Sequence, residues 1–308
     1  MPVPNTVGVT EVVLRDGLQD EDVIVPTEAK TALFEDLVRA GVRSIELGAF
    51  VRPDRVPTMA DTDELFARLR GRAGVTCSGL VMNLAGARRA LAAGAAEVRL
   101  VVSASEGHSR ANAGRGRDEA LEEVVQASTA LAGSADAPVI SAGIATAFVC
   151  PYDGPTPPKR LADMATRLAG AGATSISLAD TLGAADPLQV RAGISAVREA
   201  LPGVQLGLHL HDTHGRALAC AWEALQHGVD WFDSSLGGVG GCPFAPGAAG
   251  NVATEDLVAM LHAVGCETGI DLPRLLDVLP VLEQLLGHPL DSRQWRLRNS
   301  GAGSPGGG

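Results

Sequence analysis

The sequence has few aromatic residues and a shortage of positive charge. Aromatic residues make up 3% of the 308 residues, and 25 Lys and Arg stand against 36 Asp and Glu, which gives a formal net charge of -11. Such an acidic chain is unsuited to nonspecific binding of nucleic acid or of anionic membrane surfaces. Any acidic ligand must therefore be met by a local cluster of basic side chains. Because aromatic residues are scarce, Ala, Val and Leu must fill the core, and a hydrophobic content of 46% suffices for one large globular domain.

The chain also lacks long apolar runs and a cysteine framework. No stretch approaches the roughly 18 apolar residues that a membrane-spanning helix requires. The N-terminus shows neither the apolar segment of a signal peptide nor an Arg-rich transit pattern. The five cysteines show no paired spacing, which argues against disulfides and against a zinc ribbon. We therefore expect reduced thiols, a cytoplasmic location, and no membrane or nucleic-acid partner.

A weak internal repeat indicates the architecture. Four glycine-centred segments each follow an Ala- and Leu-rich helical pattern and precede a short apolar strand pattern. These segments are Ala40-Gly41-Val42, Ala93-Gly94-Ala95, Ala171-Gly172-Ala173 and His227-Gly228-Val229. Each glycine suits the left-handed residue that ends a helix. If the segments mark every second strand, the unit length is about 31 residues, which is typical of an eight-unit βα barrel.

The rest of the chain fits eight strands that alternate with eight helices. The predicted strands are 9–14, 44–47, 75–81, 97–102, 139–148, 175–180, 204–210 and 231–234. The predicted helices are 27–40, with Thr27 as N-cap, and 61–69, 84–93, 117–132, 158–171, 186–200, 216–227 and 254–264. We therefore predict an α/β fold, a (β/α)8 TIM barrel. A doubly wound open sheet is the alternative, but the Gly-x-Gly-x-x-Gly motif that it would carry after the first strand is absent.

The C-terminal part of the chain is expected to add little to the barrel. Residues 271–286 have the pattern of an additional C-terminal helix, and the last ten residues are mostly Gly, Ser and Pro. We predict a single domain over residues 1–290 that includes this helix. Residues 291–308 are predicted to form a mostly disordered tail.

Two histidines with strand spacing form the most informative short pattern. Residues 207–215 read Gly-Leu-His-Leu-His-Asp-Thr-His-Gly. In a strand, residues two apart share a face, so His209 and His211 would point the same way while the leucines point the other. Two neutral imidazoles fixed at one spacing suit a divalent metal ion. The alternative is that both are core histidines that only make hydrogen bonds.

Polar side chains gather at the ends of the predicted strands, where a βα barrel carries its chemistry. They are Arg15, Asp16, Glu46, Asp180, His209, His211, Cys242 and Asn251. Buried charges at this end are costly unless they are paired or bind a metal, although each carboxylate alone could be a structural salt-bridge partner. The predicted metal ligands are Asp16, His209, His211 and Asn251. Two nitrogens, a carboxylate and an amide oxygen suit octahedral Mg²⁺ or Mn²⁺ better than tetrahedral Zn²⁺, which ligand type alone does not exclude.

Four motifs together carry a family resemblance. They are Leu-Arg-Asp-Gly-Leu-Gln-Asp-Glu at 14–21, Phe-Val-Cys-Pro-Tyr-Asp-Gly at 148–154, His-Leu-His-Asp-Thr at 209–213, and Gly-Gly-Val-Gly-Gly-Cys-Pro-Phe at 237–244 followed by Gly250-Asn251. With these motifs, the chain from about residue 9 to residue 286 resembles the 3-hydroxy-3-methylglutaryl-CoA lyase family. The resemblance implies a metal-dependent TIM barrel that cleaves 3-hydroxy-3-methylglutaryl-CoA to acetyl-CoA and acetoacetate.

The resemblance also implies roles for the site residues. The family's metal ligands match Asp16, His209, His211 and Asn251. Arg15 matches an arginine that stabilises the enolate, and Cys242 matches the cysteine of a mobile loop. Active-site carboxylates of the family fall at Glu46, Asp180 and Glu255. The residues that we expect to be catalytic are Arg15, Asp16, Glu46, Asp180, His209 and Cys242, with a divalent metal, Mg²⁺ or Mn²⁺, as cofactor and CoA as part of the substrate.

The predicted reaction is a retro-Claisen cleavage of a 3-hydroxyacyl-CoA to acetyl-CoA and a keto acid. A metal that chelates the substrate hydroxyl and a carbonyl oxygen lowers the hydroxyl pKa, and a base removes that proton. The carbon–carbon bond then breaks to leave a thioester enolate. One alternative is a related condensing synthase or aldolase that acts on a variant acyl-CoA or a 2-keto acid, but such relatives usually carry further C-terminal sequence. Another is a barrel kept only for binding, whose signature would be lost ligands, and none is lost.

Three departures from the family pattern concern the acyl specificity. Leu14 stands where a proline is usual, Gly48-Ala49 replaces a pair of hydroxyl residues, and His214 replaces a tyrosine. All three lie near the expected site. They leave the predicted metal ligands intact.

A basic segment after the fourth predicted strand is the candidate site for the CoA phosphates. Residues 109–117 hold Arg110, Arg115 and Arg117 in an otherwise acidic chain, and guanidinium groups suit phosphate. A solvated loop is the alternative. We expect these arginines to bind the cofactor part of a small-molecule acyl-CoA substrate, and we expect the protein to be a homodimer.

Glycines on both sides of Cys242 predict a moving lid. Four of the five residues at 237–241 are glycine, and two more glycines follow before Asn251. So few side chains leave this backbone free to move. We expect the Cys242 thiol to give a proton to the enolate. The alternative is that Cys242 is a small apolar residue that packs the closed loop.

Overall fold

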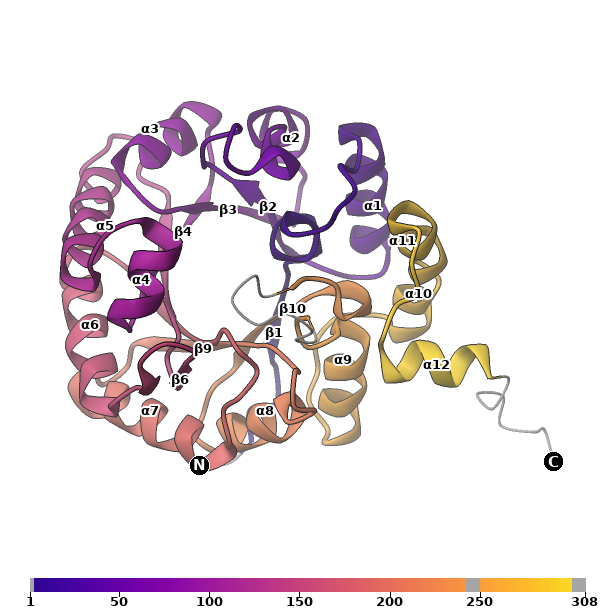
Figure 1. Ribbon diagram of the computed structural model, residues 1–308. Coiled ribbons are helices and arrows are strands. Elements are labelled where there is room, and N and C mark those ends of the chain that lie inside the picture. The colour runs from indigo at the N-terminus through magenta and orange to yellow at the C-terminus, as the bar shows by residue number, and fades with distance from the viewer. Residues whose placement is uncertain (1–2, 242–249, 301–308) are drawn as a thin grey trace.

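Eight parallel strands close into a barrel, and helices surround it (Figure 1). The computed structural model describes residues 3–241 and 250–300. Around the barrel the strand order is β1-β10-β9-β8-β5-β4-β3-β2, so the last strand of the chain pairs with the first. The predicted (β/α)8 TIM barrel is confirmed.

The barrel strands are β1 (Gly8–Glu11), β2 (Ser44–Ala49), β3 (Thr76–Val81), β4 (Glu97–Ser103), β5 (Val139–Ala145), β8 (Ser175–Asp180), β9 (Gln205–Leu210) and β10 (Trp231–Ser234). The helices that alternate with them are α1 (Thr27–Arg39), α2 (Thr62–Leu69), α3 (Leu84–Ala93), α5 (Arg117–Ala132), α6 (Pro158–Gly170), α7 (Pro187–Ala200), α8 (Ala217–Gln226) and α9 (Thr254–Ala263). Strands β6 (Val149–Cys150) and β7 (Gly154–Pro155) form a separate antiparallel hairpin. The remaining helices are the π-helical turn η1 (Val13–Gly17), the 3-10 turns η2 (Pro57–Met59) and η3 (Leu236–Gly238), and α4 (Glu106–Ala113), α10 (Leu272–Leu276), α11 (Leu279–Leu286) and α12 (Arg293–Asn299).

The barrel strands are buried on both faces, as is usual where helices cover a parallel sheet. On β9 every residue after Gln205 is buried. Leu208 and Leu210 belong to the hydrophobic core, whereas His209, which points the other way, lines the cavity of the barrel. The alternation predicted for this strand therefore places the leucine side chains on one face and the His209 imidazole on the other.

Some element boundaries differ from the predictions for local reasons. The first strand ends at Glu11, because the Glu11 side chain accepts a hydrogen bond from the Val13 backbone N–H at 2.9 Å and the chain turns into η1. The fifth strand ends at Ala145, before Thr146, whose φ of 52° is incompatible with a strand. Thr27 is the first residue of α1 rather than its N-cap. Helix α4 was not predicted.

The C-terminal region is more ordered than predicted. The helix expected over 271–286 is divided into α10 and α11. The expectation of a mostly disordered tail is wrong for the first part of that segment, where α12 forms, and residues 301–308 lie outside the described residues. The Ser292 side chain caps α12 by accepting from the Trp295 N–H at 3.2 Å, and Trp295 is buried. Within residues 3–241 and 250–300, no helix combines the length and the apolar character that spanning a membrane requires.

Candidate active site

The carboxyl ends of the barrel strands surround a cavity of about 420 Å³. Polar and charged side chains line it, among them Arg15, Asp16, Glu46, Arg99, Ser103, His108, Arg115, His209, His211 and Asp233. Chemistry in this fold takes place at the carboxyl ends of the strands. We therefore take this cavity as the candidate active site.

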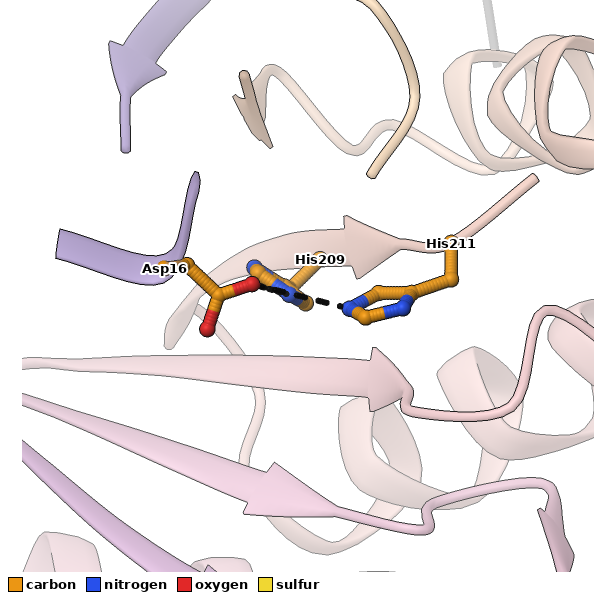
Figure 2. Close-up of side chains that lie close together, drawn as sticks. All are labelled: Asp16, His209 and His211. Carbon is orange, nitrogen blue, oxygen red and sulfur yellow. Dashed lines mark ion pairs between the residues drawn. The ribbon is translucent and has the colours of Figure 1, made fainter. Parts of the chain in front are cut away.

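Asp16, His209 and His211 meet at this cavity (Figure 2). The strand β9 brings both imidazoles to one side, with their ring centroids 5.3 Å apart, and η1 turns the Asp16 carboxylate toward them. The Asp16 Oδ2 atom lies 3.6 Å from His209 Nε2 and 3.7 Å from His211 Nε2. These separations are too long for hydrogen bonds. They suit three donor atoms that face one ion.

Arg15 keeps the Asp16 carboxylate charged. Burial alone would raise the pKa of Asp16, but the Arg15 guanidinium and the two histidines hold it well below its usual range. Arg15 bonds to Asp16 through Nη1 and donates from Nε to Glu46 Oε2 at 2.7 Å. Glu46 therefore fixes the guanidinium that stabilises Asp16. The anionic ligand that a metal needs is present at neutral pH.

Asp233 sets the orientation of His209. In the parallel pairing of β10 with β9, Asp233 lies beside His209, and its Oδ2 is 3.3 Å from His209 Nδ1. When Nδ1 carries the hydrogen, Nε2 is left for a metal, as is usual where a carboxylate supports a metal-binding histidine. On the other side, Arg99 Nη1 lies 2.9 Å from Asp233 Oδ1, and the Arg99 guanidinium lies over the Trp231 ring. Burial favours a raised pKa for Asp233, but Arg99 and His209 lower it.

A short backbone ladder places Asn251 opposite His211. The N–H of Asp212, directly after His211, donates at 3.0 Å to the carbonyl directly before Asn251. The N–H directly after Asn251 donates at 2.8 Å to the carbonyl directly before His211. The Asn251 amide nitrogen donates to Asp16 Oδ2 at 2.8 Å and to the Val239 carbonyl at 3.1 Å. The buried Oδ1 of Asn251 makes no hydrogen bond to any described residue.

The donors present fit a divalent metal ion. Two imidazole nitrogens and a carboxylate oxygen lie within 4.8 Å of one another. A buried amide oxygen without a hydrogen bond lies beside them, on a residue that already contacts Asp16. An unsatisfied buried acceptor is costly unless a partner binds it. Three of the predicted ligands therefore converge, and the fourth adjoins them.

Two other carboxylates predicted at the site, those of Asp180 and Glu255, accept hydrogen bonds from loop backbone. Asp180 accepts hydrogen bonds from the backbone N–H groups of Ala184 at 3.2 Å and Ala185 at 3.0 Å. Glu255 accepts from the Gly237 N–H at 3.1 Å, and burial raises its pKa to about 7. Among the described residues that line the cavity, neither is present. A catalytic role for Asp180 stays a prediction, and its observed contacts are structural.

The three arginines of the basic segment have different ion-pair partners. Arg115 lines the cavity and pairs with Glu123. Arg110 is exposed and pairs with a glutamate one helical turn before it, at 2.7 Å. Arg117 lies in a second groove, formed by residues of α5 and α6, and pairs with Asp118 at 2.8 Å. The three side chains therefore pair with three different carboxylates, and of the three only Arg115 is among the described residues that border the cavity.

Cys242 lies outside the described residues. The residue before it, Gly241, lines the cavity. The glycine-rich segment therefore reaches the cavity at Gly241, the last described residue before Cys242. The prediction for the Cys242 thiol stays a prediction.

Arg99, Asp233 and the residues of α4 were not predicted as parts of the site. Arg99 and Asp233 are charged residues in the middle of apolar strands, and that position was the signal that could have identified them. Helix α4 supplies His108 and Ser109 to the cavity wall. Its polar composition gave no apolar period to detect.

Comparison with known proteins identifies the family. A family model described as HMGL-like matches residues 6–282. The chain belongs to the HMGL-like family. The resemblance stated from the sequence motifs is thereby confirmed.

Similar family members are lyases. Hydroxymethylglutaryl-CoA lyase of Bacillus subtilis is 39% identical, with 97% of this chain and 100% of the relative covered. The (R)-citramalyl-CoA lyase of Chloroflexus aurantiacus is 42% identical over 92% of each chain. A solved lyase of Acinetobacter baumannii, in complex with coenzyme A and 3-methylmalate, has a TM-score of 0.91 and 37% identity, with 99% of this chain and 98% of that chain covered. These relatives confirm the predicted enzyme class, a carbon–carbon lyase.

The Asp233–His209 contact predicts a loss of metal affinity. In Asp233→Asn, the negative charge that supports the His209 ring is removed, so Mn²⁺ should bind about tenfold more weakly, the lower end of the effect of such supporting groups. Electron paramagnetic resonance of free Mn²⁺ measures the affinity on purified protein. The exposed Asp230→Asn, just before the same strand, serves as control. Equal Mn²⁺ affinities of Asp233→Asn and Asp230→Asn would contradict the supporting role of Asp233 for His209.

Proposed function

We propose that this chain is a divalent-metal-dependent lyase that cleaves a 3-hydroxyacyl-CoA, with 3-hydroxy-3-methylglutaryl-CoA as the leading substrate. The observation that carries the proposal is the convergence of Asp16, His209 and His211 on one cavity. It occurs in a family whose members are named for this cleavage. The relative with bound coenzyme A supports an acyl-CoA as ligand.

The residues of the site take distinct parts in the reaction. A divalent ion held by Asp16, His209 and His211, with Asn251 as the fourth protein donor, would acidify the substrate hydroxyl. We assign the uptake of the hydroxyl proton to Asp16, because both ring nitrogens of His209 are already used, Nδ1 toward Asp233 and Nε2 toward the ion. Arg15, which Glu46 holds in place, lines the same cavity and would stabilise the charge of the developing enolate oxygen.

The ion that fits this donor set best is Mg²⁺ or Mn²⁺. Mixed oxygen and imidazole ligands with room for substrate oxygens suit an open octahedral ion. Zinc usually prefers a tetrahedral set with more nitrogen or sulfur donors. We rank Zn²⁺ below the other two on this ground.

The three departures from the family pattern, at Leu14, Gly48-Ala49 and His214, are not among the described residues that line the cavity. Leu14 is fully buried in the core. His214 is exposed, and its backbone N–H donates a hydrogen bond to the Gly183 carbonyl. At Gly48, a side chain would meet the Thr62 hydroxyl, at 2.5 Å from an added Cβ. This supports the same acyl class as in the relatives. Their names include both 3-hydroxy-3-methylglutaryl-CoA and (R)-citramalyl-CoA, so the acyl group must be measured.

An assay of acetyl-CoA release from a panel of 3-hydroxyacyl-CoA thioesters tests the proposal. We expect 3-hydroxy-3-methylglutaryl-CoA to be cleaved, EDTA to abolish turnover, and Mg²⁺ or Mn²⁺ to restore it. His209→Ala should lower kcat by about a thousandfold or more, because it removes a ligand of the ion that acidifies the hydroxyl. Full activity after exhaustive chelation would refute the metal dependence. Release of acetyl-CoA from no member of the panel would refute the substrate class.

The position of Arg115 predicts a selective effect on substrate binding. Because Arg115 borders the cavity, Arg115→Ala should raise KM for the acyl-CoA several-fold and make KM more sensitive to salt. Arg110→Ala and Arg117→Ala are matched controls, because these side chains lie away from the cavity and should change KM less. Steady-state kinetics at two salt concentrations provide the measurement. An equal rise in KM in all three variants would instead support binding of the CoA phosphates by all three arginines.

We propose that the Cys242 thiol gives a proton to the enolate carbon. Cys242→Ser keeps the size but raises the pKa of the donor, and Cys242→Ala removes the donor. Both should lower kcat at least about a hundredfold, the usual scale for a general acid, with metal affinity unchanged. Near-normal kcat in Cys242→Ala would leave the thiol only a packing role.

We also propose a homodimer in the cytoplasm in which residues 1–290 act as one domain. The acidic composition and the absence of a cysteine framework support an intracellular setting without nucleic-acid or membrane partners. Light scattering of the purified protein measures its mass. A monomeric mass near 31.6 kDa at working concentration would refute the dimer.

A further inference from the structure

Arg293, at the start of α12, contacts the two segments that carry His211 and Asn251. Its Nη1 lies 2.9 Å from Asp212 Oδ2 and 3.4 Å from Asp256 Oδ2. Asp212 directly follows His211, and Asp256 lies in the first turn of α9, the helix that follows Asn251. One guanidinium therefore bridges the carboxylates of both segments.

Both carboxylates also accept hydrogen bonds from backbone N–H groups. Asp212 Oδ1 accepts a hydrogen bond from the Ala217 N–H, at the start of α8, at 2.8 Å. Asp256 accepts from the backbone N–H groups of Arg293 at 2.9 Å and Gln294 at 2.8 Å. Asp256 is 3% exposed, so its charge needs these donors. The beginning of α12 supplies them.

Helix α12 is itself anchored, so Arg293 is a fixed point. Trp295 is buried and donates from its indole nitrogen to Glu283 of α11 at 3.4 Å. Just before the helix, Leu290 packs against Gly237, where an added Cβ would meet the leucine at 3.0 Å. Gly237 lies in the loop after β10 that leads toward Asn251. In Figure 1, α12 follows α11 at the side of the barrel where α9 lies.

The backbone ladder between His211 and Asn251 needs such support. It consists of two hydrogen bonds around these two residues, 3.0 Å and 2.8 Å long. The chain continues from His211 into Asp212 and from Asn251 toward Asp256, and Arg293 contacts both aspartates. A movement of either segment would change the spacing of the donor atoms, which a metal site requires within a few tenths of an ångström.

We propose that Arg293 is a positioning residue of the metal centre, which ties the Asp212 and Asp256 carboxylates together and thereby keeps His211 and Asn251 at the spacing that the ion requires. The proposal rests on the metal site proposed above. Arg293 acts through the two aspartates and does not touch the ion. Residues 291–299 belong functionally to the active site, although they lie outside the repeated βα units.

Metal affinity of the full chain tests this role without any substrate. Arg293→Met should bind Mn²⁺ about tenfold more weakly, as expected when a group behind the ligands is lost. Arg293→Lys should recover part of the affinity, because the shorter lysine keeps a positive charge near the two carboxylates without the reach and planar geometry of the guanidinium. Arg296→Met is the control. Its arginine lies on the same helix and pairs with Asp291, at 3.3 Å and away from the ligands, so its affinity should equal that of the unmodified chain.

A double variant shows whether Arg293 acts through Asp212. If it does, Arg293→Met with Asp212→Asn should lose little more affinity than either single variant. Additive losses, or an Arg293→Met variant that binds Mn²⁺ as tightly as Arg296→Met, would overturn the proposal while the metal site stands. An unmodified chain that binds no Mn²⁺ would overturn the metal site and this proposal together.

Discussion

Compensation of buried charge at the barrel mouth is the constraint on which the site depends. Asp16 is surrounded by partners, with Arg15 on one side and the two histidines on the other. Behind Arg15 stands Glu46, and behind His209 stand Asp233 and Arg99. A carboxylate in so little solvent would become neutral without these partners. The alternating chain of charges therefore maintains the anionic donor and fixes its geometry at the same time.

The local irregularities of the backbone serve the same constraint. The chain leaves β1 for a π-helical turn, which brings two charged residues to the cavity within one turn. At the other side, the antiparallel contact between His211 and Asn251 is an exception in an otherwise parallel barrel. Both features place donor atoms where regular strands would not. Deviations from regular structure are expected where function requires them.

The sequence predicts the barrel and the convergence of Asp16, His209 and His211 better than the residues that support them. The period-two spacing of His209 and His211 is a local pattern, and the barrel then brings Asp16 and the strand ends together by topology. The position of Arg99 and Asp233 within apolar strands is a signal of burial, but the sequence does not identify their partners, because a charged residue is exposed far more often than buried. Helix α12 was not predicted, because the segment was grouped with the Gly-, Ser- and Pro-rich end of the chain, and its order rests on the Ser292 cap, the buried Trp295 and the pairing of Arg293.

The cavity divides its tasks between two walls. The wall from η1, β9 and β10 carries charged groups, each tied to a neighbour, so a change there disturbs several contacts at once. The wall from α4 and the end of β4 presents uncharged polar groups such as Ser103 and His108, with Arg115 just beyond the helix, whereas Arg99 of β4 belongs to the charged wall through its pairing with Asp233. Burial lowers the pKa of His108 to about 4, so its ring is neutral at physiological pH. Among the described residues, Ser103 and His108 form no ion pair with Asp16, His209 or His211, so a change at these two positions leaves the charged contacts of the other wall in place. Relatives named for two different thioesters are consistent with such a division.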